Sequence, residues 1–346
     1  MSGAKKTSIG NTDLAIDALG FGCASLGNLY HTVSDEEATD ILETAWSRGF
    51  RYFDTAPHYG QGLSERRIGD ALRASIRRDY LLSTKVGRLL RPAGYAAERH
   101  GFVSPMPFDI SYDYSYDGVM RSFEDSLQRL GLDRIDILFM HDIGAVTHGD
   151  DNNRLFPIAM DGGYRALDEL RRDGRVSAIG LGVNEFEVCE QALDYGDWDC
   201  FLLAGRYTLL EQTSLDTFLP KCIDRNCSII IGGAYNSGIL ATGVSGKGPW
   251  HYDYGPAPDD VVTKVAAIEG LCAEFDIPLA AAALQFPLAH PAVASVIPGI
   301  GNVRRIDQTL ELFSTEIPDG FWNELSRQGL VRDDAPTPST NDGPGE

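Results

Sequence analysis

The chain has 346 residues, of which 43% are hydrophobic and 23% charged, and its 50 acidic and 30 basic residues give a formal net charge of −20. This composition is that of a globular chain with a large core, so a disordered or fibrous protein is excluded. The negative charge would repel phosphates, which excludes nucleic acid as a partner. No apolar run approaches the roughly 18 residues of a membrane span. The N-terminus lacks the apolar stretch of a secretory signal, so we expect no membrane partner and a cytoplasmic location.

Short apolar and β-branched runs recur along the chain, and helical patterns lie between them. The runs are 18–23, 50–54, 80–86, 135–141, 176–182, 199–204, 228–232 and 293–298. Nearly continuous apolar runs of this length are typical of parallel strands buried on both faces. Eight β-then-α units predict an α/β fold, a single (β/α)8 barrel over residues 1–331, rather than two domains.

Local signals place the ends of several elements. The capping box Ser34-Asp-Glu-Glu37 opens the first helix, and Ser64 is expected to cap the second. Residues 9–13 predict the turn of an N-terminal hairpin that closes the barrel floor. The Pro-, Asp- and Gly-rich segment 332–346 predicts a disordered tail.

Three connections are longer than a barrel requires. They are 87–115 after the third strand, 142–162 after the fourth and 239–258 after the seventh. All three follow strands, and they are therefore expected on the C-terminal face, where barrel enzymes build their sites. Long loops on that face indicate a function.

Four titratable residues stand at or near the ends of consecutive strands. Asp54 ends the second run and Tyr59 follows it, Lys85 lies near the end of the third run, and His141 ends the fourth. The ends of parallel strands meet at the barrel mouth, so these side chains should converge. A nearby ammonium lowers the pKa of a phenol, which is about 10 when free, and Asp54 would hold that ammonium in place. Tyr59 then serves as acid to a carbonyl or base to an alcohol, His141 orients the substrate oxygen, and no metal is required.

These residues lie in longer segments with a distinctive order: FGCASLGN, GFRYFDTAPHYGQGLSERRIGDAL, LLSTKVG, RSFEDSLQRLGLDRIDILFMHD, GRVSAIGLGVNEF, GGAYNSGIL and VIPG. In these segments, which together cover nearly the whole chain, the sequence resembles the aldo-keto reductases. The catalytic Asp, Tyr, Lys and His of that family fall on Asp54, Tyr59, Lys85 and His141. The resemblance implies NAD or NADP lying extended across the C-terminal face without a Rossmann fold. In agreement, residues 20–25 break the GxGxxG pattern at its last position.

The resemblance also implies the cofactor contacts. Asn184 would bind the nicotinamide amide, and residues 236–238 would lie along the pyrophosphate. The full implied set is Gly22, Cys23, Asp54, Asn184, Asn236, Ser237, Gly238, Gly299, Gly301, Arg305 and Gln308. Ile300 and the absence of a following Lys remove one usual partner of the NADP 2′-phosphate, which favours NAD, although Arg305 could still pair with that phosphate.

The sequence departs from the family pattern around the nicotinamide. Val183 stands where many relatives have Ser, Ala204 where they have Gln, and Gly232 or Gly233 where they have a stacking Tyr. The nicotinamide pocket is therefore expected to be looser than in those relatives.

The stretches LLAGRYTLLEQ, GGAYNSGILA and DYSYDGVMRS resemble a bacterial branch of the family that oxidises aldoses of the L-fucose (D-threo) type at C1, or pyridoxal at C4. In that direction Tyr59 is the base, and the product is a lactone. The predicted substrate contacts, which offer stacking faces or hydrogen-bonding groups, are Tyr30, His58, Tyr59, His141 and Trp250.

Other functions stay open at this stage. In the reverse direction, the same residues would catalyse the reduction of aldehydes or ketones. A non-catalytic nicotinamide-sensing subunit is another alternative, because potassium-channel β-subunits also resemble this family. A metal-dependent barrel hydrolase would need an HxH motif on the first strand, and residues 20–25 contain none.

The six cysteines form no CxxC pair and have no zinc-ligand spacing with histidine, so neither a metal site nor a disulfide framework is expected. The oligomeric state is left open.

Overall fold

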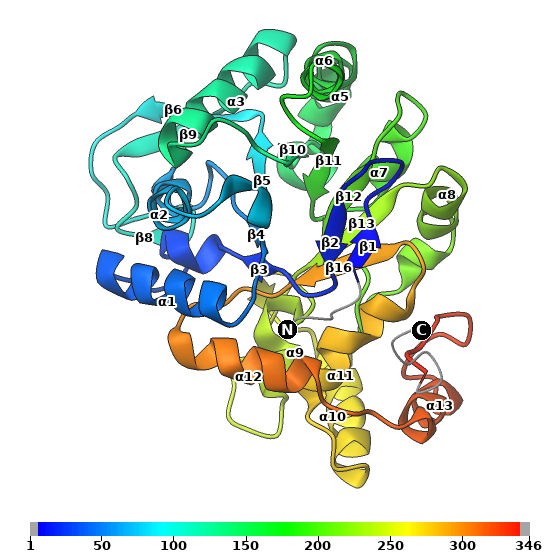
Figure 1. Ribbon diagram of the computed structural model, residues 1–346. Coiled ribbons are helices and arrows are strands. Elements are labelled where there is room, and N and C mark those ends of the chain that lie inside the picture. Colours follow the sequence, from blue (N-terminus) through cyan, green and yellow to red (C-terminus); the bar gives the residue numbers. More distant parts are fainter. Residues whose placement is uncertain (1–5, 340–346) are drawn as a thin grey trace.

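The computed structural model describes residues 6–339, and eight parallel strands form its centre (Figure 1). In chain order, which is also their order in the sheet, they are β3 (Phe21–Gly22), β4 (Tyr52–Asp54), β5 (Leu81–Val86), β10 (Ile137–His141), β11 (Ala178–Val183), β12 (Cys200–Ala204), β13 (Ser228–Gly232) and β16 (Val293–Ile297). Parallel bridges from Leu19 to Val296 and from Gly22 to Gly299 join the first strand to the last. The predicted (β/α)8 barrel is therefore confirmed, and each predicted run overlaps one of its strands.

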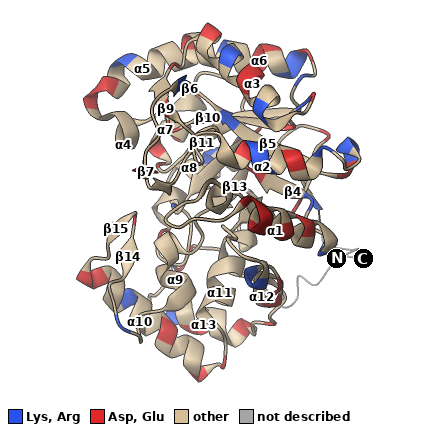
Figure 2. Cartoon of the chain, turned by 90° about the vertical axis from the view of Figure 1, so that its left-hand side faces the viewer, with Lys and Arg blue, Asp and Glu red and all other residues tan. Residues whose placement is uncertain are grey.

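Helices cover the outside of the barrel (Figure 1). They are α1 (Asp35–Ser47), α2 (Leu63–Leu72), α3 (Tyr116–Leu130), α4 (Ala145–His148), α5 (Asn152–Ile158), α6 (Arg165–Arg172), α7 (Glu187–Ala192), α8 (Phe218–Asp224), α9 (Ile239–Thr242), α10 (Asp259–Glu274), α11 (Leu279–Gln285), α12 (Val303–Phe313) and α13 (Asp319–Arg327). Acidic and basic residues lie mostly on these helices and on the loops, whereas the central strands are largely uncharged (Figure 2). This division is the one expected of strands buried on both faces.

The N-terminal hairpin closes one end of the barrel, as predicted. Strands β1 (Lys6–Ser8) and β2 (Ala15–Asp17) pair antiparallel. Their connection and β2 contribute Ile9 and Ile16 to the buried cluster inside the strands. The Gly10 amide donates to Ser228 Oγ at 2.9 Å. Because Ser228 is the first residue of β13, the hairpin lies at the amino ends of the strands, opposite the predicted site.

Each of the three long connections contains secondary structure of its own. Segment 87–115 forms two antiparallel pairs, β6 (Arg88–Pro92) with β9 (Phe108–Tyr112) and β7 (Glu98–Arg99) with β8 (Phe102–Val103). Segment 142–162 contains α4 and α5, and segment 239–258 contains α9 and the pair β14 (His251–Tyr252) and β15 (Gly255–Pro256). These additions lie at the carboxyl ends of the strands.

Two sequence predictions need correction. The residue before α2 is Gly62, not Ser64, and the buried Ser64 hydroxyl instead donates to the Cys23 carbonyl at 2.9 Å. The segment from Arg332 does not begin as a disordered tail. The Arg332 amide donates to Gln212 Oε1 at 3.1 Å, and Ala335 is 6% exposed. Residues 340–346 of that prediction lie outside the described residues.

Between residues 6 and 339, no helix is long and apolar enough to cross a membrane. In the same range, no three His, Cys, Asp or Glu side chains are grouped so that they could hold a metal ion.

Candidate active site

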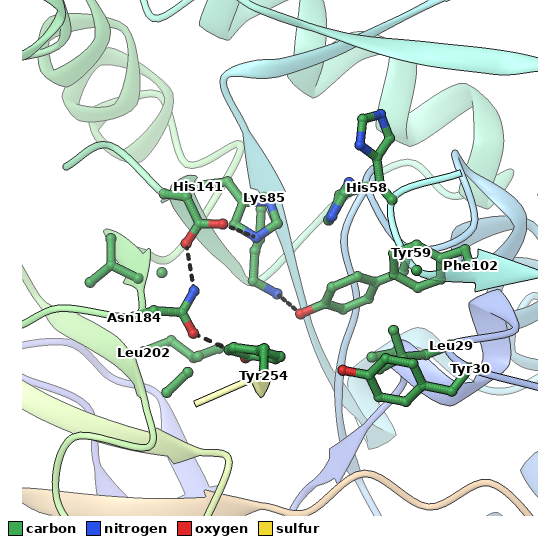
Figure 3. A pocket seen from close by; sticks show the side chains of 17 residues that line it. Leu29, Tyr30, His58, Tyr59, Lys85, Phe102, His141, Asn184, Leu202 and Tyr254 are labelled. Carbon is green, nitrogen blue, oxygen red and sulfur yellow. Dashed lines mark hydrogen bonds and ion pairs between the residues drawn. The ribbon is translucent and has the colours of Figure 1, made fainter. Parts of the chain in front are cut away.

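The side chains of Asp54, Lys85 and Tyr59 meet at the carboxyl ends of β4 and β5. The Lys85 ammonium donates to Asp54 Oδ2 at 2.7 Å, to the Thr55 carbonyl at 2.9 Å and to the Tyr59 hydroxyl at 3.2 Å. Figure 3 shows Lys85 pointing at that hydroxyl. Lys85 is 1% and Asp54 2% exposed. The structure therefore brings three of the four predicted catalytic residues into direct contact.

Strand geometry explains this convergence. Asp54 on β4 lies opposite Ser83 on β5, and Ser83 Oγ donates to Asp54 Oδ1 at 2.7 Å. The Tyr52 hydroxyl bonds the same Ser83 oxygen at 3.0 Å. Because side chains two residues apart share one face of a strand, Tyr52 and Asp54 face the same side as Ser83 and Lys85. The segments YFD and STK thus fix both oxygens of the Asp54 carboxylate.

The electrostatics of this group suit proton transfer at Tyr59. Burial raises the pKa of the Tyr59 phenol, and the Lys85 charge is the largest influence that lowers it. Burial alone would lower the pKa of Lys85, but the Asp54 charge and Tyr59 outweigh it and hold that pKa above its ordinary value. Lys85 is therefore an ammonium at neutral pH and stabilises the phenolate form of Tyr59.

His141, the fourth predicted catalytic residue, ends β10. Its ring stands edge-on to Tyr59 with centroids 6.2 Å apart. Burial, then the charges of Arg88 and Lys85, lower the pKa of His141 well below its ordinary value. The ring is therefore neutral, and one nitrogen carries a hydrogen that can be donated to a substrate oxygen.

These residues face a cavity of about 410 Å³. It is lined by Ala24, Leu29, Tyr30, His58, Tyr59, Lys85, His100, Gly101, Phe102, His141, Asp142, Gly182, Val183, Asn184, Leu202, Ala204 and Tyr254. Figure 3 shows Tyr254 near the Tyr59 hydroxyl, and Tyr30 and Phe102 beside the Tyr59 side chain. The cavity thus offers both polar groups and aromatic faces to a ligand.

The predicted substrate contacts divide into two groups. Tyr30, His58, Tyr59 and His141 line the cavity. Trp250 is not among the described residues that line it, and Tyr254 of the same loop is. Trp250 packs instead against the hydrophobic core. Within this lining, the predicted substrate contacts omitted His100, Phe102, Asp142 and Tyr254. Of these, only Asp142 had a signal in the sequence, because it directly follows the strand-end His141.

Asn184, the predicted nicotinamide contact, is held between two cavity residues. Its Nδ2 donates to Asp142 Oδ1 at 3.2 Å, and its Oδ1 accepts from the Tyr254 hydroxyl at 3.0 Å (Figure 3). Val183 and Ala204, two of the departures from the family pattern, line the same cavity. Ala204 is smaller than the glutamine of many relatives and leaves room in the cavity, whereas Val183 is larger than their serine.

The predicted pyrophosphate segment follows β13. Asn236, Ser237 and Gly238 all have positive φ, at 44°, 58° and 96°. Among the described residues, the buried Asn236 Oδ1 has no hydrogen-bond partner. A Cβ on Gly238 would meet no atom within 4 Å. Arg305 is exposed on α12. Gly238 and Arg305 are therefore open to a ligand on this side of the mouth, whereas Asn236 is not.

Three predicted cofactor residues have other neighbours. A Cβ on Gly22 would lie 2.9 Å from the Ile297 carbonyl, so strand packing alone requires that glycine. The Cys23 side chain is fully buried, and its thiol donates to the Phe21 carbonyl at 3.5 Å. Gln308 lines a separate hollow with Thr242 and Glu269. For Gly22 and Cys23, the residue type has a local explanation independent of a cofactor, and Gln308 lies outside the lining of the Tyr59 cavity.

The fold is a (β/α)8 barrel, and contacting tyrosine, lysine and aspartate side chains lie at its mouth. Residues 18–328 match the model of the aldo/keto reductase family, and the chain belongs to that family. It is 44% identical to pyridoxal 4-dehydrogenase of Microbacterium luteolum over 96% of this chain and 99% of that one. It is 40% identical to D-threo-aldose 1-dehydrogenase of a Pseudomonas species over 94% of this chain and 96% of that one. The holo form of an aldo-keto reductase from Bacillus halodurans superposes with a TM-score of 0.72 at 25% identity, covering 95% of this chain and 97% of that one.

Proposed function

We propose that the protein is an NAD(P)-dependent dehydrogenase that oxidises a cyclic hemiacetal carbon, C1 of an aldose of the L-fucose type, to a lactone. The observation that carries this proposal is the Tyr59–Lys85–Asp54 contact beside the neutral His141 in a cavity with polar and aromatic walls. The 40% identity to a D-threo-aldose 1-dehydrogenase supports the substrate class.

The residues at the mouth fit a nicotinamide cofactor. Asn184 has an amide suited to the nicotinamide amide, and Gly238, where a Cβ would meet no atom within 4 Å, leaves the backbone beside the mouth unobstructed. When bound, NAD(P) supplies the hydride acceptor. We propose that NAD is preferred over NADP, because Ile300 and the absence of a following Lys remove one usual partner of the NADP 2′-phosphate.

The protein's own part in the reaction is to place and move the proton. The hemiacetal hydroxyl gives its proton to Tyr59 while the hydride leaves the same carbon, so a C=O bond forms and the product is a lactone. Lys85 stabilises the phenolate that accepts this proton. His141 donates a hydrogen bond to the reacting oxygen and orients it.

Pyridoxal is the second candidate substrate. The 44% identity to a pyridoxal 4-dehydrogenase favours it, and the aromatic side chains of Tyr30, Phe102 and Tyr254 in the cavity suit a planar ring. Pyridoxal carries a hydroxymethyl group beside its aldehyde and also closes to a hemiacetal, so the same residues would oxidise it.

The deciding experiment measures nicotinamide absorbance with L-fucose, pyridoxal and simple aldehydes, each with NAD and NADP and in both directions. We expect oxidation of L-fucose with NAD. Tyr59→Phe should lower kcat by roughly 10²- to 10⁴-fold while NADH still binds. Full activity in Tyr59→Phe would refute the mechanism. No turnover of any substrate by a protein that binds NADH would point instead to a nicotinamide-sensing subunit, and reduction of simple aldehydes alone would point to a reductase.

A further inference from the structure

A second buried ion pair lies beside the cavity and has no part in the proton transfer described above. Asp142 directly follows His141 and is 8% exposed, and its carboxylate pairs with the guanidinium of Arg88, which is 6% exposed. Asp142 is one of the residues that line the cavity, and Arg88 supports it from behind that lining. Taking two charges out of water is costly, and a buried pair adds little net stability over apolar residues. Its presence beside the reacting groups therefore calls for a functional explanation.

The backbone holds the Asp142 side chain in this position. Asp142 has a φ of 48°, in the left-handed region. Its amide donates to the Gly182 carbonyl at 2.9 Å, and the Tyr114 hydroxyl donates to the His141 carbonyl at 2.9 Å. Asp adopts the left-handed region more readily than most residues, and these two hydrogen bonds fix the backbone on either side of its side chain.

The Asp142 carboxylate retains unused acceptor capacity. A carboxylate has about four lone-pair sites. Two donors occupy part of them: Asn184 Nδ2 at 3.2 Å on Oδ1, and Arg88 on Oδ2. The remaining capacity can serve a hydrogen-bond donor that enters the cavity.

The neighbouring donor indicates where that ligand group would lie. His141 Nε2 is 3.4 Å from Asp142 Oδ2, and the contact carries no charge attraction from a neutral ring. A hydrogen-bond donor and an acceptor thus stand side by side. Oxygens on adjacent carbons of a substrate are separated by roughly 3 Å, about the length of a hydrogen bond. A reacting oxygen at His141 would therefore place a hydroxyl of the next carbon at Asp142.

We propose that Asp142 is a specificity-determining residue that accepts a hydrogen bond from a hydroxyl on the carbon next to the reacting carbon, and that Arg88 is the positioning residue that holds its carboxylate. This inference builds on the proposed function and names the substrate feature that the site selects. Compounds with that hydroxyl are preferred over otherwise identical compounds without it.

The test compares matched substrate pairs in the whole enzyme and in Asp142→Asn. One pair, L-fucose and 2-deoxy-L-fucose, is measured by oxidation, and the other, lactaldehyde and propanal, by reduction with NADH. We expect the wild type to prefer the hydroxylated member of each pair by roughly 10- to 100-fold in kcat/KM, the size of a hydrogen bond to a charged group. In Asp142→Asn this ratio should fall to within about threefold of one.

Two further proteins separate specificity from damage to the fold. Asp136→Asn removes another buried carboxylate, paired with Arg77 at 2.6 Å at the opposite end of β10; it should lower the melting temperature and leave the ratio unchanged. Arg88→Met/Asp142→Leu removes both charges at similar volume, and it should fold and lose the preference. For the positioning role, Arg88→Lys should retain more of the preference than Arg88→Met.

The outcomes are distinct. A wild type without preference, or an Asp142→Asn protein that slows both members of a pair equally, overturns the inference. If the enzyme oxidises neither L-fucose nor pyridoxal, the proposed function is overturned. Reduction of the aldehyde pair then still reports on Asp142. Absence of turnover with every substrate overturns both.

Discussion

Replacing Lys85 with methionine removes the charge on which the acidity of Tyr59 depends while keeping a side chain of similar length. The ammonium lies 3.2 Å from the Tyr59 hydroxyl. At an effective dielectric constant of about 20, that distance corresponds to roughly 5 kcal/mol of attraction for the phenolate. Partial compensation by solvent entering the cavity reduces this value, so we expect kcat/KM for oxidation to fall about 10³-fold at neutral pH.

The same substitution should also destabilise the fold. It leaves the Asp54 carboxylate buried without its cation, and breaking a buried ion pair in this way costs about 3–5 kcal/mol. A chain of 346 residues has an unfolding entropy of about 0.7 kcal/mol per kelvin, so the melting temperature should fall by about 4–7 °C. In Asp54→Asn/Lys85→Met no buried charge is left alone, and we expect most of this stability to return without the activity.

The sign of the pH dependence follows from the charges. Burial raises the pKa of Tyr59 and Lys85 opposes it, so without Lys85 that pKa rises further. The alkaline limb along which oxidation accelerates should therefore move to higher pH in Lys85→Met. The measurements are pH profiles of kcat/KM by nicotinamide absorbance, together with thermal melting. A variant within tenfold of wild type, or an unshifted limb, would show that Lys85 does not tune Tyr59.

Three further predictions concern other parts of the molecule. Because His141 is already neutral, His141→Gln should slow turnover by roughly 10- to 100-fold and leave the shape of the profile between about pH 5 and 8 unchanged; loss of an acid limb would show that His141 titrates there. Arg305→Ala should weaken NADP binding more than NAD binding in fluorescence titrations, and equal effects would mean that Arg305 does not reach the 2′-phosphate. Gly69→Ala would place a Cβ 1.9 Å from the Leu130 carbonyl and should lower stability by about 3 kcal/mol. At Gly270 a Cβ meets nothing within 4 Å, so Gly270→Ala should leave the free energy of unfolding unchanged or raise it. Calorimetry of both variants measures these changes.

The barrel could be predicted because strands buried on both faces appear as continuous apolar runs, and because the ends of parallel strands gather at one mouth. Asp54, Lys85 and His141 lie at such ends, and their convergence requires no knowledge of the loops. Ser64 was assigned wrongly because a serine at the start of a helical pattern is typical of a cap. Its hydroxyl is used instead for tertiary hydrogen bonds with Thr55 and the Cys23 carbonyl.

The loop residues of the cavity could not be predicted in the same way. In segment 239–258, Tyr254 lines the cavity and Trp250 does not. The choice depends on the register of the short β14–β15 pair, with positive φ at Asp253 and Tyr254. It also depends on the bond from Arg206 to Asp253 at 2.8 Å. Both are tertiary features of a segment too short for a periodic pattern to fix its register.

Two buried ion pairs each place one member on the cavity wall: Lys85, paired with Asp54, and Asp142, paired with Arg88. Stability alone does not account for such pairs, since apolar residues of similar volume would serve as well. The first pair contacts the hydroxyl of Tyr59 through Lys85, where the proton moves in the proposed reaction. The second lies beside His141 Nε2, where a substrate oxygen would be held. Removing both charges of one pair should therefore leave a folded protein with a specific defect: lost turnover for the first pair and lost substrate discrimination for the second.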